Sequence, residues 1–431
     1  MTTANHQSKP LDYPLKSHRW KVLAAGVAAN ASFSVAFSGL PMTAVLMRTA
    51  YHLDNATLGL MLGLMGLGIA LSELPWGMLT DRWGDRPVLL LGLGSTVCAL
   101  LAMCVWAGPA GMADTPSAVW PLLGAGLVLV GLLGGSVNGA SGRAVMAWFS
   151  AQERGLAMSI RQTAVPMGGA IGALLLPWLA GQGGFRWIYA LLASLCAVSA
   201  ALCWAWVHEP DREPASQGTA AASTPTPLRD PQIWRMVAGM GLLCAPQFAV
   251  LSFGTVFLHD FAGLGLGHIS AAMALVQLGA MGLRIWSGRW TDRRGNRPRF
   301  LRACALFSAG AFLALSALTL VASNTHPWGL GWPLCSLLVL SGLIVSAWHG
   351  VAYAELGTRA GAAQSGTALG MANTSVFVVC FLTPLVIPHL LALQGWPLVW
   401  LAASSVACAT RALLAPRHGA SKQVLRSLLS S

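Results

Sequence analysis

The feature that most constrains the fold is a series of apolar stretches, each about 20 residues long, that recurs along nearly the whole chain. Six begin near residues 21, 56, 87, 119, 155 and 186, and six more begin near residues 233, 268, 298, 331, 364 and 396. A helix of about 20 residues spans the ~30 Å hydrocarbon core of a bilayer. In lipid, backbone N–H and C=O groups must form their hydrogen bonds within the protein. We therefore predict an all-α integral membrane protein with twelve transmembrane helices.

The charge content agrees with a bilayer and argues against a nucleic-acid partner. Charged residues make up 9% of the 431 residues, and hydrophobic residues make up 55%, whereas a soluble domain carries about 25% charged residues. The net charge of +12 would suggest nucleic-acid binding in a soluble protein. Here the basic residues lie in short loops beside apolar stretches. The 9 cysteines fall inside apolar stretches without metal or disulfide spacing, so we interpret them as packing residues.

The distribution of Lys and Arg predicts the orientation in the membrane. Of the 26 basic residues, two (Arg48 and Arg186) would lie in loops on the far side and three within spans, which leaves 21 on the side of the amino terminus. By the positive-inside rule, we expect both termini in the cytoplasm. We expect a multi-pass protein of the plasma membrane, specifically a bacterial inner membrane.

The two sets of six spans are an internal repeat. Shifting the first half by 211 residues superimposes identical residues over more than a hundred positions without a gap, such as Gly77 on Gly288 and Gly184 on Gly395. Parallel repeats predict an axis along the membrane normal and a substrate site between the halves. The predicted organisation is a tail (1–19), a six-helix bundle (20–207), a linker rich in Pro, Ser, Thr and Ala (208–232), a second bundle (233–414) and a tail (415–431).

A basic loop is repeated at equivalent places in the two halves. It reads GMLTDRWGDRP at 77–87 and GRWTDRRGNRP at 288–298. Both copies resemble the signature loop of the major facilitator superfamily, and with twelve spans the resemblance covers nearly the whole chain. It implies two pseudo-symmetric six-helix bundles and transport by alternating access. It also implies that these loops close the cytoplasmic side, with gating residues Asp81, Arg82, Arg86, Asp292, Arg293 and Arg297. An ordinary solvated basic turn is the alternative.

Two further motifs match the family in part. The segment 152–155 fits the usual E-R-G turn, but Gly131 stands where an Arg is often found in span 4. In span 5, PMGG at 166–169 is one residue short of the pattern of drug/proton antiporters. The mismatch favours other transporters over this efflux class.

Ionisable residues inside the spans are functional candidates by default. Arg284 lies eight residues before Asp292, about 12 Å from the end of its span, and its repeat equivalent is Glu73. Pseudo-symmetry would set these opposite charges across a central cavity. An anion on Arg284 and a proton on Glu73 would form a symport scheme; alternatively, the two side chains pair only to satisfy one another.

An Arg at this place in span 8 is similar to that of anion-carrying branches: monocarboxylate, oxalate/formate and nitrate/nitrite porters. Nitrate porters have a second Arg where this chain has Glu73, so the resemblance implies a small organic anion, specifically a carboxylate. The other expected substrate-binding residues are polar groups at similar depth: Arg161, Asn138, His349, Asn30 and Gln247. His349 is also a candidate for proton coupling or a packing residue. Arg161 and Arg143 could instead extend to the interface.

The sequence thus predicts a secondary transporter of a small organic anion, driven by proton symport or exchange. The alternative is a proton-coupled exporter of lipophilic or cationic compounds, which would use Glu73 in an aromatic cavity; a transporter-like receptor is a third possibility. Nucleotide-binding, metal-binding and hydrolase motifs are absent from the sequence. We therefore predict no enzyme activity, no cofactor and no metal, with a small-molecule substrate, protons and the bilayer as partners.

Overall fold

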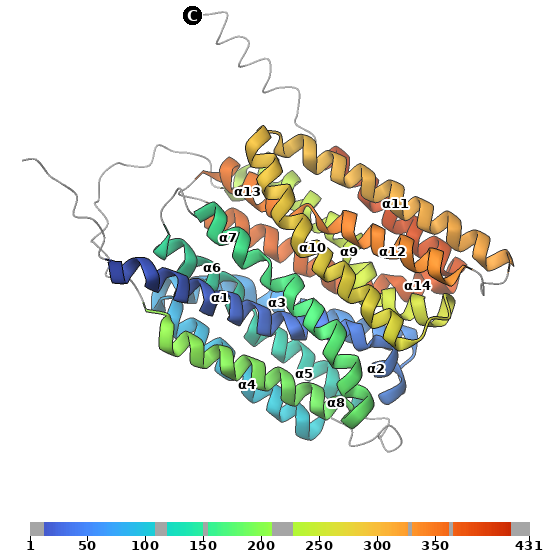
Figure 1. Ribbon diagram of the computed structural model, residues 1–431, viewed down its shortest axis with the longest axis horizontal. Helices are drawn as coiled ribbons and strands as arrows, with labels where there is room; N and C mark the ends of the chain where they lie inside the picture. Colours follow the sequence, from blue (N-terminus) through green and yellow to red (C-terminus); the bar gives the residue numbers. More distant parts are fainter. Residues whose placement is uncertain are drawn as a thin grey trace, which may run out of the picture.

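The computed structural model describes residues 13–107, 119–149, 154–208, 227–325, 330–361 and 365–414 (Figure 1). Within these ranges the chain forms helices and no β-strand. Ten helical segments are long and apolar enough to cross a membrane. The all-α prediction is therefore confirmed for the described residues.

Each half of the chain forms its own set of helices. The first half contains α1 (Tyr13–Gly39), η1 (Leu40–Thr43), α2 (Ala44–Ala50), α3 (Asn55–Trp83), α4 (Asp85–Trp106), α5 (Val119–Gly134), α6 (Ser136–Trp148), α7 (Arg154–Gln162) and α8 (Ala164–Trp206). The second contains η2 (Pro227–Arg229), α9 (Pro231–Val256), η3 (Phe257–Phe261), α10 (Leu266–Arg294), α11 (Arg297–Thr325), α12 (Gly331–Ser346), α13 (His349–Ala360) and α14 (Ser365–Leu413).

Two of the long helices contain a reversal of the chain and so account for two apolar segments each. The backbone of α8 is non-helical at Gly183 and Gly184, and that of α14 is non-helical at Gln394 and Gly395. Gly184 and Gly395, which the repeat superimposes, both have φ of 69° with ψ of −170° and −160°, a conformation that is essentially limited to glycine. Counting both sides of each reversal gives twelve apolar segments, consistent with the prediction.

Local sequence signals set several helix ends. The Asp54 carboxylate accepts a hydrogen bond from the Thr57 N–H at 2.7 Å and caps α3, and Asp230 caps α9 in the same way through Gln232. Such caps satisfy N–H groups that have no partner within the helix. In the two repeated loops the chain reverses at Gly84 (φ 90°) and Gly295 (φ 61°).

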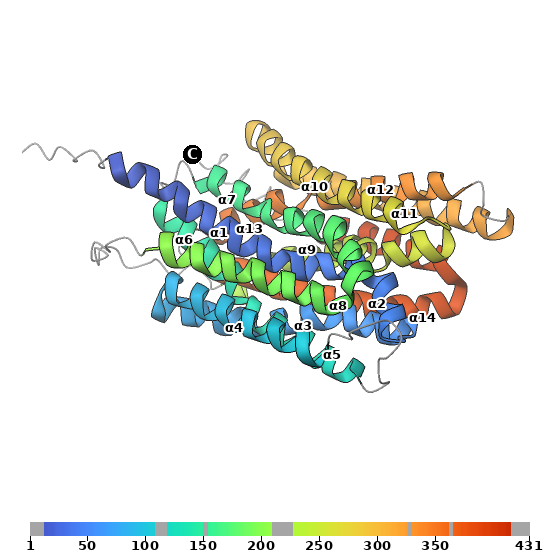
Figure 2. The same cartoon turned by 60° about the horizontal axis from the view of Figure 1, so that its bottom comes forward.

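The two halves lie side by side with their helices roughly parallel (Figures 1 and 2). Segments 17–50 and 231–261 are the most buried of the ten candidate spans. Many large apolar side chains on the outer helices are exposed, including Leu74 on α3, Val105 on α4 and Phe307 on α11. This arrangement suits a bundle surrounded by lipid rather than water.

Close glycine contacts join the halves at one end. Gly59, Gly63 and Gly66 lie along one face of α3 and pack against α14; a Cβ atom added at Gly59 would stand 2.2 Å from the backbone oxygen of Pro384. Small residues with this spacing let two membrane helices approach until their backbones touch. The predicted domain boundaries are not tested, because residues 1–12, 209–226 and 415–431 lie outside the described ranges.

Candidate functional site

A polar cavity lies between the two halves. Its volume is about 100 Å³, and its lining comes from both halves of the chain. All six residues that the sequence predicted to bind substrate are in this lining: Asn30 of α1, Asn138 of α6, Arg161 of α7, Gln247 of α9, Arg284 of α10 and His349 of α13. The structure therefore brings the predicted residues together, and their role in binding is taken up below.

Arg284 is held in the middle of α10 with its side chain almost completely buried, 6% exposed. Its Nη1 atom donates to the backbone oxygen of Gln162 in the opposite half, at 3.4 Å, and its Nε atom has no hydrogen-bond partner. No ion pair is found for this guanidinium within the described chain. A buried charge without a counter-charge is costly, so the site suits an anion.

Arg161 approaches the same cavity from the first half. It lies near the end of α7, is 7% exposed, and donates through Nη1 to Ser141 Oγ at 3.0 Å. The guanidinium packs against Gly142, where an added Cβ would stand 3.4 Å from Nη2. Its Nε atom also has no partner. Of the two sequence alternatives for Arg161, the structure shows the cavity-facing one.

Glu73 is buried in α3, 8% exposed, and belongs to a hydrogen-bond chain that crosses between the halves. Its Oε1 atom accepts from Asn373 Nδ2 at 2.7 Å, and Asn373 Oδ1 accepts from the Tyr353 hydroxyl at 2.7 Å. Among the described residues the Oε2 atom has no hydrogen-bond partner. Asn373 and Tyr353 line the cavity and Glu73 does not. The carboxylate is held at the cavity wall by Asn373, and the cavity residue Asn138 interacts with it as well.

The predicted arrangement of Glu73 opposite Arg284 is met only in part. The charged group that interacts electrostatically with Glu73 is Arg161, and no ion pair joins Glu73 to Arg284 among the described residues. Arg161 lies at the junction of α7 and α8, and the equivalent position in the second half is Ala372. The second half therefore has no charge that corresponds to Arg161. Pseudo-symmetry alone could not place this third charge.

Within the described part of the chain, the remaining polar residues of the cavity also carry atoms without a hydrogen-bond partner. These atoms are Asn30 Oδ1, Gln247 Oε1, Asn138 Nδ2 and His349 Nδ1. The His349 ring stacks on Trp348 with centroids 3.8 Å apart and interacts electrostatically with Arg284. Buried polar groups in proteins are almost always hydrogen-bonded to protein, water or ligand, so this cavity is prepared for a polar occupant.

Two cysteines in the cavity were not identified from the sequence. Cys244 of α9 and Cys380 of α14 both line it, with their sulfur atoms 3.7 Å apart. They had been interpreted as packing residues, because nothing in their spacing distinguishes them from the other cysteines. Three phenylalanines, Phe37, Phe248 and Phe377, contribute an apolar wall.

The repeated loops form ion pairs within each half. Arg143 of α6 contacts Asp81 at 2.7 Å and Asp85 at 2.9 Å, and Arg297 contacts Asp292 at 2.7 Å. Arg143 therefore pairs with the first loop and does not line the cavity. Arg86 donates to the Trp204 backbone oxygen and lies over its ring, whereas Arg82 and Arg293 are exposed. Residues 152 and 153 of the E-R-G turn lie outside the described residues.

An ion pair that the sequence analysis missed joins the halves at the opposite end. Arg48 of α2 donates to both carboxylate oxygens of Asp260 in η3, at 2.5 and 2.8 Å. The His259 ring lies 2.7 Å from the same carboxylate. These residues follow the ends of α1 and α9, at the end where the α3 glycines contact α14. A single Arg in a predicted loop gave no indication of its partner.

The comparisons with known proteins agree with this architecture. The solved structure of a D-xylose-proton symporter superimposes with a TM-score of 0.73, over 92% of this chain and 97% of that one, at 16% identity. The sequence profile described as Major Facilitator Superfamily matches residues 24–384. The chain belongs to this superfamily. It is therefore a multi-pass membrane transporter and not an enzyme, and the resemblance found in the sequence is confirmed.

The names of similar proteins within the superfamily refer to different transport functions. The chain is 30% identical to the uncharacterized MFS-type transporter MT3072 of Mycobacterium tuberculosis over 386 residues, 89% of this chain and 81% of that one. Over 162 residues it is 26% identical to the probable galactarate/D-glucarate transporter GudP of Bacillus subtilis (38% and 34%). Over 201 residues it is 29% identical to the efflux pump FUBT of Fusarium oxysporum (44% and 31%).

Proposed function

We propose that this superfamily transporter moves a small organic anion, specifically a carboxylate, by proton symport or exchange. The observation that carries the proposal is the pair of buried guanidiniums, Arg161 and Arg284, which line one cavity from opposite halves. Together with Glu73 they leave one positive charge in excess at this site. A carboxylate would supply the missing negative charge, and arginine is well suited to bind it through two parallel hydrogen bonds.

The cavity volume favours a small substrate. A volume of about 100 Å³ is well below the roughly 300–1,000 Å³ of pockets that bind drug-sized ligands. An anion of a few heavy atoms would fit between the two guanidiniums, with Asn30, Asn138 and Gln247 available to its other polar atoms. A sugar acid such as that named for the relative GudP would require the halves to separate further.

Glu73 is the proposed proton-coupling group. When ionised, it offsets the charge of Arg161 through the cavity wall; when protonated, it leaves Arg161 without a counter-charge. Protonation would therefore strengthen anion binding, and release of the proton would help release the substrate. His349 next to Arg284 is a second candidate for coupling. In either case the ligand shifts the conformational equilibrium by its differential affinity for the two states.

Alternating access would use the two ends of the bundle in turn. At one end Arg48 and Asp260 hold the halves together; at the other, the repeated loops keep Asp81 paired with Arg143, and Asp292 with Arg297, inside separate halves. We propose that residues of these loops, including Arg82, Arg86 and Arg293, form contacts between the halves when that end closes. From the positive-inside rule, this end faces the cytoplasm of a bacterial inner membrane.

The test is the melting temperature of the detergent-purified protein against a panel of small carboxylates, inorganic anions and lipophilic cations. Wild type is compared with Arg284→Ala and with Arg299→Ala, which removes an exposed Arg of the same half. A ligand that binds the folded state at 100 times its Kd stabilises it by about 2.7 kcal/mol. We expect a carboxylate to stabilise wild type and Arg299→Ala and to have no effect on Arg284→Ala.

The two cavity cysteines provide an independent readout. A carboxylate that occupies the cavity should slow the reaction of Cys244 and Cys380 with a maleimide in wild type. If carboxylates neither raise the melting temperature nor protect these thiols, the anion proposal is wrong.

One observation favours the exporter alternative. The Phe37 ring stacks on Phe248 at 5.7 Å and meets the Phe377 ring edge-on at 5.3 Å, which gives the cavity an aromatic wall near Glu73. Phe37 lines the cavity, whereas Phe33 and Phe253 are buried in the core. Stabilisation by lipophilic cations alone, with Arg284→Ala behaving as wild type, would establish this alternative.

A further inference from the structure

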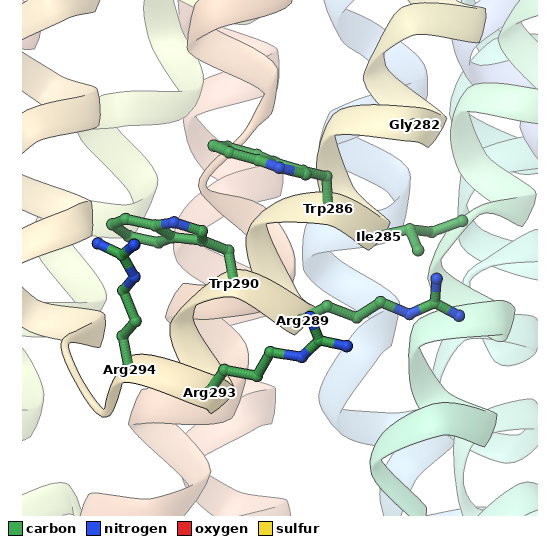
Figure 3. A pocket seen from close by; sticks show the side chains of 7 residues that line it. All are labelled: Gly282, Ile285, Trp286, Arg289, Trp290, Arg293 and Arg294. Carbon is green, nitrogen blue, oxygen red and sulfur yellow. The ribbon is translucent and has the colours of Figure 1, made fainter.

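A second site lies on the outer surface of α10, near its carboxyl end. There a groove of about 600 Å³ is lined by one face of the helix (Figure 3). The seven residues that line it are Gly282, Ile285, Trp286, Arg289, Trp290, Arg293 and Arg294. They occupy the last three turns of a predicted membrane span, where the apolar segment meets the basic loop.

The groove is strongly basic. Arg289, Arg293 and Arg294 are all exposed, and none of them forms an ion pair within the described part of the chain. Asp292, the acidic residue between them in the sequence, is paired with Arg297. The spacing of four residues puts Arg289 and Arg293 on one side of the helix, and Arg294 lies on the other side of the groove, with the tryptophans (Figure 3). The groove therefore carries three positive charges available to a ligand.

Two tryptophans form the other part of the groove. The Trp286 and Trp290 rings are stacked with centroids 5.9 Å apart, and the Arg294 guanidinium lies 4.9 Å from the Trp290 ring centre. Figure 3 shows both indoles and Arg294 on one side of the helix, with Arg289 and Arg293 extending to the other. Trp286 is 53% exposed. Tryptophan favours the boundary between the acyl chains and the headgroups of a bilayer.

The repeat shows that this surface is particular to the second half. At the positions of Gly282, Ile285 and Arg289, the first half has Leu71, Leu74 and Met78. The same fold is thus built in the first half with apolar side chains at these three positions. Gly282 has no atom within 4 Å of an added Cβ, so the space beside it is not filled by another part of the described protein.

We propose that this groove binds the headgroup of an anionic phospholipid. The phosphate would be held by Arg289 and Arg293 through charge-assisted hydrogen bonds, with Arg294 adding its positive charge from the other side of the groove, and the first part of an acyl chain would lie along Trp286 in the space left by Gly282. The combination of basic and aromatic groups at the end of a span fits a lipid better than a free phosphate. A phosphate ion would leave the exposed indole uncovered.

The test is a titration of the delipidated full-length protein in detergent with phosphatidylglycerol, followed by native mass spectrometry and by melting temperature. Phosphatidylcholine and inorganic phosphate are titrated in parallel. The test variant is Arg289→Gln/Arg294→Gln, which leaves the gating candidate Arg293 in place. The control is Arg299→Gln/Arg411→Gln, which removes the same charge from exposed positions outside the groove. A third variant, Gly282→Leu, fills the groove and leaves its charge unchanged.

We expect phosphatidylglycerol to bind wild type and the control with equal affinity. Each lost Arg should weaken binding about fivefold, so the test variant should bind roughly 25-fold more weakly. Gly282→Leu should also weaken binding without lowering the melting temperature of the lipid-free protein. Equal loss in the control, or equal stabilisation by inorganic phosphate, would overturn the proposal.

Discussion

Breaking the ion pair between Arg48 and Asp260 should open one end of the transporter. The guanidinium contacts both carboxylate oxygens, and the two side chains are 23% and 31% exposed. Exposed ion pairs contribute about 0.2–1 kcal/mol; the bidentate geometry and partial shielding place this one near the upper end. A loss of about 1 kcal/mol changes a conformational ratio about fivefold.

The native cavity thiols can report this change. In a background where the other cysteines are replaced, Cys244 and Cys380 should react with a membrane-impermeant thiol reagent added from the Arg48 side. For Arg48→Gln we expect a rate about five times that of wild type, because the cavity opens to that side more often. Arg48→Lys keeps the charge and loses the bidentate geometry, so its rate should be intermediate.

Exchange of the two charges provides the control. Arg48→Asp combined with Asp260→Arg should restore most of the slow rate, because the pair is re-formed in the opposite sense. The reasoning is refuted if Arg48→Gln reacts at the wild-type rate, or if the exchanged pair reacts as fast as the single variants do.

Three other substitutions test separate parts of the structure. Gly59→Leu should cost about 1–3 kcal/mol of packing between the halves and speed the same thiol reaction, whereas Gly94→Leu, which faces open space, should not. Asp54→Ala should lower the melting temperature through the loss of a cap worth about 1 kcal/mol, and Asp54→Asn, which keeps a hydrogen-bond acceptor but loses the charge, should lower it less. The Thr57 N–H holds the pKa of Asp54 below its usual value. The extra stability of the charged cap is therefore complete above the usual pKa and is lost as the pH falls through the lowered pKa. Below the lowered pKa, the melting temperatures of wild type and Asp54→Asn should converge. Glu73→Gln should abolish accumulation driven by a pH gradient and leave substrate exchange, as measured in proteoliposomes.

The sequence was sufficient for the fold because the signals are strong and repeated. Apolar length determines the spans, and a constant offset of 211 residues relates the two halves, down to the reversals at Gly184 and Gly395. Depth along a span was also informative: a distance of eight residues from the loop aspartates placed Arg284 in the cavity and Glu73 close behind its wall.

The sequence could not supply contacts between segments that share no pattern. Arg143 looked equally suited to the cavity, to the interface and to pairing, and its choice of Asp81 and Asp85 depends on how α6 packs against the first loop. Cys244 and Cys380 come into contact because α9 and α14 cross at their positions. The pairing of Arg48 with Asp260 depends on the closed arrangement of the halves at that end.

The opposite charges at Glu73 and Arg284 have a consequence for how such a protein could have arisen. Two copies of the first half would bring two carboxylates to equivalent buried positions, and two copies of the second half would bring two guanidiniums. Either homodimer would hold like charges at one site without compensation. The combination of one carboxylate and one guanidinium at these equivalent positions therefore depends on divergence between the two halves.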